Sequence, residues 1–289
     1  MTAPSARRIF LSTPLRNEIK NIDRLFASVA AQDVHIDTWV IVENGSTDGS
    51  REKLASIEVP ANVGQLITLN EDTETGAYAL GQKYARIVNR GFEEIRAKKD
   101  LQAQDLIGIL DADSFPEPGY YSALVRAFDA DPKLGISSGR ALDEGDRSAS
   151  VHAADWVMGS CRLWRGACML QSGYVIGPSA DTLSLARAEL DGWSARVAPG
   201  ATFLAREVGS RAKQRYYGAS AHFRGNTPLY ALIRGMKMVL RGKIGGGKDF
   251  IAGYFEAQRG RAPRLEDPQL RTYFEGYILR KARKRLPFL

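Results

Sequence analysis

Two aspartates, two residues apart, follow the apolar run Leu106–Leu110. Residues two apart in an extended chain point to the same side, so Asp111 and Asp113 converge just beyond the end of the expected strand. Ligands bind at that end of the strands in open α/β sheets. Paired carboxylates suit Mg²⁺ or Mn²⁺, which in turn hold phosphates. Taken alone, an Asp-x-Asp triplet is more typical of a solvated turn, because aspartate is common where strands end.

The elements expected before this triplet alternate between strands and helices. Short apolar runs predict strands over residues 8–13, 39–42, 64–69 and 106–110. Helical spacing of apolar residues predicts the helices between them, which are a first helix capped by Asn17 or Asn21 and two more over 50–57 and 76–97. We expect Pro14 to stop the first strand. This order predicts an α/β fold with a Rossmann-like, mostly parallel central sheet flanked by helices.

The pattern is looser after the triplet. It predicts a helix over 120–130, a strand over 135–139, a helix that begins at Ser179 or Asp181, and a strand over 196–203. From Pro228 the chain is expected to be helical and basic, with a break at Gly245-Gly246-Gly247. We therefore expect a catalytic domain over 1–225, with halves 1–115 and 116–225, and a helical basic C-terminal extension over 226–289.

The composition of the 289-residue chain, with 44% hydrophobic and 25% charged residues, is that of a soluble globular protein. No apolar run approaches the roughly 20 residues of a membrane-spanning helix. The residues behind Arg7-Arg8 are too few for a signal-peptide core, so we expect a cytoplasmic protein, with peripheral attachment to the inner face of the membrane as an alternative. Cys161 and Cys168 are expected to be reduced structural thiols.

Positive charge is concentrated in the C-terminal part. The whole chain carries +7, and residues 226–289 hold 14 Lys and Arg against 5 Asp and Glu. Such a segment predicts an anionic partner, either a membrane surface or a nucleic acid. The sequence contains no recognisable nucleic-acid-binding module, so we do not expect a nucleic acid as partner. A basic amphipathic helix in this segment favours binding to a membrane surface. The simpler alternative is that the helix packs on the catalytic domain and exposes its basic face to solvent.

Four motifs in chain order resemble a family 2 glycosyltransferase with the GT-A fold, and the resemblance covers nearly the whole chain. They are Leu11-Ser12-Thr13-Pro14-Leu15-Arg16-Asn17-Glu18, then Val40-Ile41-Val42-Glu43-Asn44-Gly45-Ser46-Thr47-Asp48-Gly49-Ser50, then Asp111-Ala112-Asp113, and finally Asp181-Thr182-Leu183 through Gly192-Trp193. Three positions depart from the family pattern. Glu43-Asn44 replaces two aspartates, Ala180 replaces a glutamate, and no histidine occurs in the Thr202–Glu207 stretch, where many relatives have a third metal ligand.

The resemblance implies an inverting transfer of a sugar from a nucleoside-diphosphate-sugar, with UDP- and GDP-sugars as first candidates, to a glycan or lipid-linked acceptor in polysaccharide biosynthesis. It implies Mn²⁺ or Mg²⁺ on Asp113, with Asp111 beside the ion, on the ribose or on a metal-bound water. The nucleotide would lie against two groups of residues, Pro14, Arg16 and Glu18 in the first loop and Glu43, Asn44 and Ser46 in the second. Asp181 would be the catalytic base, although a first-turn carboxylate also fits a helix N-terminus.

Several alternatives stay open from the sequence. Water or diphosphate oxygens, His222, or positive charge from Arg206, Arg211 and Lys213 would each compensate for the missing third metal ligand. A catalytically silent scaffold of the same fold is the main alternative function. A sugar-phosphate nucleotidyltransferase is disfavoured, because no Gly-rich loop bearing Arg or Lys follows the first strand. The isolated histidines (His35, His152, His222) and the tryptophans (Trp156, Trp164, Trp193) are more typical of structural roles than of ligands or sugar platforms.

Overall fold

The computed structural model describes residues 7–71, 81–143, 145, 155–205 and 214–285 of the chain. Contacts divide the chain into two compact units, Met1–Val208 and Gly209–Leu289. The division falls earlier than the expected boundary after residue 225, because the helix over Gln214–Arg224 packs with the helices that follow it. The two units are described separately.

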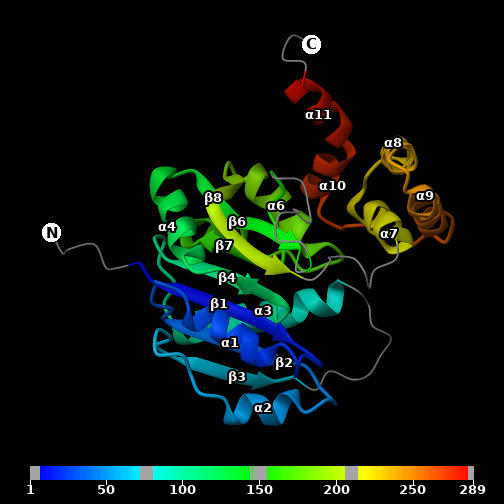
Figure 1. The fold of residues 1–289 in the computed structure, drawn as a ribbon. Helices are drawn as coiled ribbons and strands as arrows, with labels where there is room; N and C mark the ends of the chain where they lie inside the picture. The colour runs from blue at the N-terminus through cyan, green and yellow to red at the C-terminus, as the bar shows by residue number, and fades with distance from the viewer. Residues whose placement is uncertain (1–6, 72–80, 144, 146–154, 206–213, 286–289) are drawn as a thin grey trace. The chain divides into compact units, whose positions relative to one another are not determined.

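The first unit is built on one mixed sheet with the strand order β3-β2-β1-β4-β7-β6-β8-β5 (Figure 1). The strands are β1 (Ile9–Leu15), β2 (Thr38–Glu43), β3 (Leu66–Asn70), β4 (Leu106–Leu110), β5 (Ser114–Pro116), β6 (Leu134–Asp143), β7 (Cys161–Arg165) and β8 (Ser194–Ala205). The parallel arrangement expected from the sequence holds for β3-β2-β1-β4 and for β6 with β8. Strand β7 runs antiparallel to both β4 and β6, so its first residues lie beside the end of β4.

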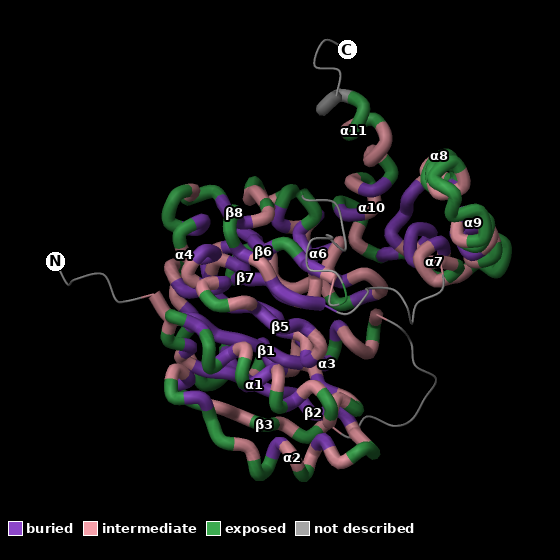
Figure 2. The backbone as a smooth tube through the Cα atoms, in the orientation of Figure 1, coloured by how far each residue is buried: buried purple, intermediate pink, exposed green. Residues whose placement is uncertain are grey.

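Helices cover both faces of this sheet. They are α1 (Ile22–Ala30), α2 (Ser50–Ser56), α3 (Gln82–Lys98), α4 (Tyr120–Ala130), α5 (Gly166–Ser172) and α6 (Ala180–Leu190). Alternate residues of each strand point to opposite faces. Leu11 and Ile41 accordingly pack with α1 and α4, whereas Phe10 and Val40 pack with α3 and α5. The central strands are buried throughout, as Figure 2 shows, which explains their continuous apolar sequence.

Strand β1 continues through Pro14 to Leu15, contrary to the expectation that proline would stop it. Proline removes the N–H group that a ladder requires. The backbone of residues 8, 10, 12 and 14 faces β4, where Leu106 N–H donates to Arg8 O. The pairing of β1 with β4 ends at Ser12, so Pro14 reaches a position where no ladder bond is lost. Its other side stays paired with Val42 of β2.

The second unit is helical. Its elements are α7 (Gln214–Arg224), α8 (Pro228–Leu240), α9 (Ile244–Arg259), α10 (Pro268–Glu275) and α11 (Tyr277–Arg285). The expected break at Gly245-Gly246-Gly247 is wrong, because these glycines form the first turn of α9. A Cβ at Gly247 would lie 2.5 Å from Gly235 O of α8, and one at Gly253 would lie 2.0 Å from Arg215 O of α7. The glycines therefore allow close packing of α9 on its neighbours.

Candidate active site

The side chains singled out from the sequence follow neighbouring strands at one edge of the sheet. Arg16 and Glu18 follow β1, Asn44 follows Glu43 at the end of β2, and Asp111 follows β4. Because β1, β2 and β4 are parallel, their carboxyl ends meet at this edge. Asp111 N–H donates to Ser160 O at 2.7 Å, which fixes the start of the Asp-Ala-Asp triplet against the residue that precedes β7.

The loops after β1 and β2 are tied to each other by four hydrogen bonds, and a fifth lies within the second loop. Asn17 N–H donates to Ser46 Oγ (2.9 Å), and Thr47 N–H donates back to Asn17 Oδ1 (2.8 Å). Asn17 adopts a positive φ of 54°, a conformation that asparagine tolerates. Two more backbone groups of the first loop donate hydrogen bonds to the second loop. Glu18 N–H donates to Ser50 Oγ (3.0 Å), and Ile19 N–H donates to Asp48 Oδ2 (3.1 Å). Asp48 Oδ1 accepts from the Ser50 hydroxyl at 2.6 Å, which completes the network.

Glu43 holds the second loop from inside. Its side chain is fully buried, with Ser46 N–H donating to Oε1 at 2.5 Å and Arg51 Nε donating to Oε2 at 2.8 Å. Burial by itself raises the pKa of Glu43, but the hydrogen bonds from Ser46 and Arg51 prevail and hold this pKa below its ordinary value. Glu43 therefore fixes the shape of the loop in which Asn44 and Ser46 lie.

Asp111 is bound by a residue that the sequence did not single out. The Tyr84 hydroxyl, on the first turn of α3, donates to Asp111 Oδ1 at 2.6 Å. Burial, and then the nearby Asp113 carboxylate, raise the pKa of Asp111 well above its ordinary value. The hydrogen bond from Tyr84 opposes that rise. A cation placed between Asp111 and Asp113 would relieve the same repulsion, so this pair fits a divalent ion.

A buried arginine interacts with both Asp111 of the triplet and Asp181. Arg162 of β7 is 1% exposed, and its Nη1 donates to the backbone oxygen of Asp181 at 3.3 Å. Burial lowers the pKa of Arg162, and the negative charges of Asp181 and Asp111 oppose that effect. Asp181 itself lies in the first turn of α6 and is partly exposed. Arg162 thus interacts electrostatically with both the proposed base and the first aspartate of the triplet.

Residues 12–191 match the family described as Glycosyl transferase family 2. The chain belongs to glycosyltransferase family 2. The matched region contains every candidate residue named above, from Pro14 to Asp181. No curated protein matches the sequence.

Solved structures resemble this glycosyltransferase at low sequence identity. S. aureus TarS residues 1–349 in complex with UDP matches with a TM-score of 0.55 and 13% identity, covering 94% of this chain and 91% of that chain. The mannosyltransferase PcManGT from Pyrobaculum calidifontis, in complex with GDP-Man and Mn²⁺, matches with a TM-score of 0.51 and 15% identity, covering 98% and 88%. The chain spans 43% of the longer S. aureus TarS structure. These likenesses confirm the GT-A fold.

Positive charge lies beside the loops of this family 2 glycosyltransferase. Burial, and then repulsion from Arg16, lower the pKa of Lys83 at the start of α3. Two cations that repel each other at the carboxyl end of the sheet suit an anionic ligand such as a diphosphate. The sequence indicated Arg16 for this role but not Lys83, since a lysine at the start of a helix carries no distinctive signal.

Metal donors are few in the described part of the chain. No group of three or more His, Cys, Asp or Glu side chains is gathered there in a way that could hold an ion. Mg²⁺ commonly takes one or two carboxylates together with substrate phosphates, so Asp111 and Asp113 fit it. His222 is buried in the C-terminal unit with its ring centroid 5.6 Å from that of Tyr254, which is the environment of a core residue. Arg206, Arg211 and Lys213 lie outside the described residues.

Other side chains considered from the sequence have structural positions. Trp164 is fully buried against Phe92 and Tyr174, and Trp193 Nε1 donates to Gln171 Oε1. Cys161 and Cys168 are buried free thiols, and burial raises the pKa of each to about 12. Trp156 is 44% exposed, and His152 lies outside the described residues. Among the described tryptophans, Trp156 is exposed and Trp193 is partly exposed, so each retains surface that a sugar ring could contact.

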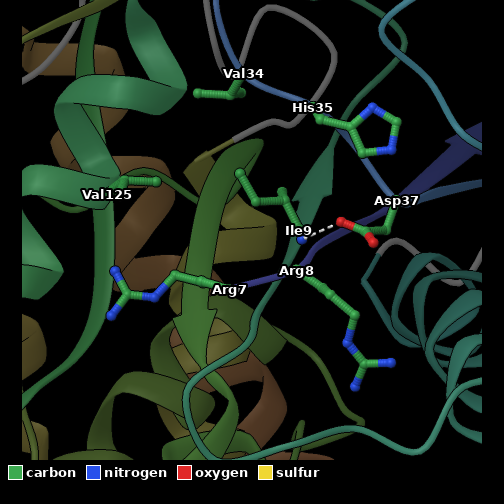
Figure 3. Close-up of a pocket in the computed structure, with 7 residues that line it drawn as sticks. All are labelled: Arg7, Arg8, Ile9, Val34, His35, Asp37 and Val125. Atoms are coloured by element: carbon green, nitrogen blue, oxygen red, sulfur yellow. Dashed lines mark hydrogen bonds between the residues drawn. The ribbon is translucent and has the colours of Figure 1, made fainter. Parts of the chain in front are cut away.

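A pocket of about 390 Å³ lies at the opposite end of β1 (Figure 3). Its walls include Arg7, Arg8 and His35, together with Val125 of α4. Arg7 is paired with Asp129 and Arg8 with Asp105, so the charge of each guanidinium is already partly neutralised. Ligands of open α/β sheets bind at the other end of the strands, and the pocket is therefore separate from the candidate active site.

Proposed function

We propose that this family 2 enzyme transfers a sugar from a UDP- or GDP-sugar to an acceptor hydroxyl with inversion, in the synthesis of a cell-surface glycan or polysaccharide. The proposal is supported by the Asp-Ala-Asp triplet, which follows β4 next to β1 and its loop, and by the hydrogen bond from the buried Arg162 to the backbone of Asp181. The complexes of the neighbours with UDP, UDP-GlcNAc and GDP-Man support a nucleotide-sugar donor.

Each group has a part in this reaction. The nucleotide lies along Pro14, Arg16 and Glu18, and its base lies at the Glu43–Ser46 loop, with Glu43 shaping that loop from within. Arg16, together with Lys83, attracts the diphosphate. Asp113 and Asp111 would hold a divalent ion, which would supply Lewis-acid stabilisation of the departing diphosphate.

Asp181 accepts the proton of the acceptor hydroxyl. The hydroxyl oxygen then forms the new bond to the anomeric carbon. The bond between that carbon and the phosphate oxygen breaks on the opposite face, and nucleoside diphosphate leaves.

The first test is a thermal-shift panel of UDP, GDP, CDP and dTDP, each with and without Mn²⁺, because a ligand of the native state raises its stability. We expect one nucleotide to raise Tm in a metal-dependent way. Turnover of the matching nucleotide-sugar, measured as release of nucleoside diphosphate, then distinguishes an enzyme from a silent scaffold of this fold. Binding without any release over the protein-free rate would contradict the proposal.

The acceptor side of the proposal includes an anionic membrane surface, at which a lipid-linked acceptor would lie. No helix within the described residues is long and apolar enough to cross a membrane. Helix α8 nevertheless exposes large apolar side chains, and Leu240 is 78% exposed. The exposed large apolar residues on or next to this helix are Leu229, Leu232, Ile233, Met236, Leu240 and Ile244. Residues 228–248 contain five Lys or Arg and no Asp or Glu, so this face is complementary to anionic lipid.

Sedimentation with vesicles tests this attachment. We expect binding to anionic phosphatidylglycerol vesicles and little to phosphatidylcholine vesicles, since each basic residue near anionic lipid contributes about 1 kcal/mol. Leu240→Glu should weaken the binding. Leu170→Glu is the matched control, because Leu170 is also exposed (57%) but lies on α5 of the first unit. Equal loss in both variants, or equal binding to both kinds of vesicle, would contradict the attachment.

A further inference from the structure

One buried charge near the proposed active site has hydrogen-bonding capacity that the described structure does not use. Arg162 Nε donates to Gly159 O at 3.4 Å and Nη1 donates to Asp181 O at 3.3 Å, but Nη2 has no hydrogen-bond partner. Buried polar groups are almost always hydrogen-bonded, so an unpaired guanidinium nitrogen in a side chain that is 1% exposed requires an explanation. The Tyr174 hydroxyl is also buried and without a partner, and its charge interactions include Arg162 and Asp181.

The space around Nη2 is kept open by a glycine. A Cβ built on Gly159 would lie 3.0 Å from Arg162 Nη2, 3.1 Å from Asp181 Cβ and 3.5 Å from Asp181 Oδ2. Nη2 and the Asp181 carboxylate therefore border the same small volume, although no hydrogen bond joins them. The guanidinium also lies over the Trp164 ring, with Cζ 5.2 Å from the ring centroid.

We propose that Arg162 is a positioning residue for the transfer reaction, fixing the first turn of α6 through Nη1 and presenting Nη2 as a positive neighbour of the Asp181 carboxylate. The inference rests on the proposed function, in which Asp181 is the base. A fixed cation attracts the carboxylate and so restricts the directions in which it can point. Because Arg162 is also attracted to Asp111, the same charge links the base to the donor side of the site.

Strand β7 contains a matched control for this role. Arg165 is also on β7, three residues further on, and it bonds only to backbone oxygens, namely those of Leu134, Phe128 and Asp131. Replacing either arginine by methionine removes one positive charge from the same strand and keeps a side chain of similar length. A loss that is merely structural should therefore be similar in the two variants, whereas a loss of positioning should appear in Arg162→Met alone.

The test compares kcat and KM of the wild type, Arg162→Met, Arg162→Lys and Arg165→Met, at matched fractions of folded protein. We expect Arg162→Met to lower kcat roughly 10- to 100-fold, within the range of coupling between residues of one network. KM for the donor should stay within about threefold of wild type, because the donor contacts lie after β1, β2 and β4. Arg162→Lys keeps the charge and should restore part of kcat, and Arg165→Met should leave kcat nearly unchanged.

A double mutant completes the experiment. In the Asp181→Asn background, Arg162→Met should cause little further loss, because the carboxylate that the arginine serves is already gone. Multiplicative losses in the double mutant, or a kcat of Arg162→Met equal to that of Arg165→Met, would overturn the positioning role. If Arg162→Met does not fold, Arg162→Lys compared with Arg165→Lys decides on the same criterion. Absence of turnover in the wild type would instead refute the proposed function itself.

Discussion

The donor side and the acceptor side of the candidate site are built in different ways. The loops after β1 and β2 satisfy one another, with Asn17, Ser46, Asp48 and Ser50 exchanging hydrogen bonds between them. Around Arg162 the hydrogen bonding is incomplete. Nη2 of this buried cation has no partner among the described residues, although it lies near the Asp181 carboxylate. The first region is complete without a ligand, whereas the second retains polar capacity that substrate or ordered water would fill.

This difference separates two ways of preparing a site. A hydrogen-bonded loop network fixes shape before the ligand arrives, which reduces the entropy lost on binding. An incompletely paired buried charge costs stability, but it interacts strongly with a reacting group because water is excluded around it. Substitutions in the loops should therefore affect stability and donor binding, and substitutions around the buried charge should affect turnover.

Asp113→Ala should abolish transfer, with a loss on the order of 10⁴-fold in kcat/KM, since it removes a carboxylate expected to hold the cation that stabilises the leaving diphosphate. The Tm should stay close to wild type, because this side chain at the end of a strand supports a ligand rather than the core. Release of nucleoside diphosphate in added Mn²⁺ or Mg²⁺ measures the effect, and EDTA should reproduce it reversibly in the wild type. Asp129→Ala, at an exposed carboxylate bonded to Arg7, serves as control. Retention of most activity would refute the metal role.

Asp181→Asn should lower kcat by roughly 10²- to 10³-fold, because general-base catalysis contributes on that order. Nucleotide affinity, measured by calorimetry with the diphosphate that the thermal-shift panel selects, should barely change. If nucleotide binding is lost together with turnover, Asp181 is part of the folding of α6 rather than the base.

The donor side was predictable because its signals are local. Each loop follows an apolar run and contains polar residues of its own, so Asp111, Asp113 and the Glu43–Ser50 stretch could be placed at strand ends without knowledge of the tertiary fold. The prediction that Pro14 stops the first strand was wrong. A proline is tolerated in β1 at this position because the pairing with β4 has already ended at Ser12. That is a property of the partner strand, which the residues around Pro14 do not encode.

The acceptor side was less predictable because it depends on non-local pairing. Arg162 interrupts an apolar segment, and this interruption was the signal available in the sequence. Its meaning depends on β7 running antiparallel to β4, which brings the start of β7 to the carboxyl edge of the sheet. Tyr84 was missed for a similar reason, since nothing near it in sequence points to Asp111. In α9 the glycines were read as a break, although their function is close helix packing.

Tyr84→Phe should raise the Mn²⁺ concentration for half-maximal activity about tenfold, because groups hydrogen-bonded to a metal-binding carboxylate orient it. The phenylalanine keeps the packing of the ring and removes only the hydrogen bond to Asp111. Tyr121→Phe is a matched control, as it removes a buried hydroxyl on the other face of the sheet. An unchanged metal requirement in Tyr84→Phe would show that the hydroxyl does not orient Asp111.

Asp48→Ala should lower the free energy of unfolding by about 1 kcal/mol, the usual net value of a hydrogen-bonding group, and should weaken nucleotide binding more than it lowers kcat. Burial by itself raises the pKa of Asp48, but hydrogen bonds from Ser50 and Ile19 prevail and hold this pKa below its ordinary 3.8. A carboxylate with a lowered pKa stabilises the fold above pH 3.8 and loses that contribution as pH falls further. The difference between wild type and variant in urea unfolding should accordingly vanish in acid, and a difference that persists at pH 2 would contradict the electrostatic origin.

His222→Leu should have the smallest effect and should leave the Mn²⁺ requirement unchanged, because the imidazole lies in the core of the C-terminal unit. Burial, and then the positive charge of Arg264, lower the pKa of His222 below its ordinary 6.5. Between pH 6.5 and the lowered pKa of folded His222, the unfolded chain therefore binds a proton on this imidazole and the folded chain does not. The free energy of unfolding of the wild type should decline as pH falls below 6.5. The variant lacks this proton and should show a shallower decline in urea unfolding between pH 6.5 and 5. If His222→Leu instead raises the Mn²⁺ concentration for half-maximal activity manyfold, the imidazole is a metal ligand and its interior position in the C-terminal unit is not the functional state.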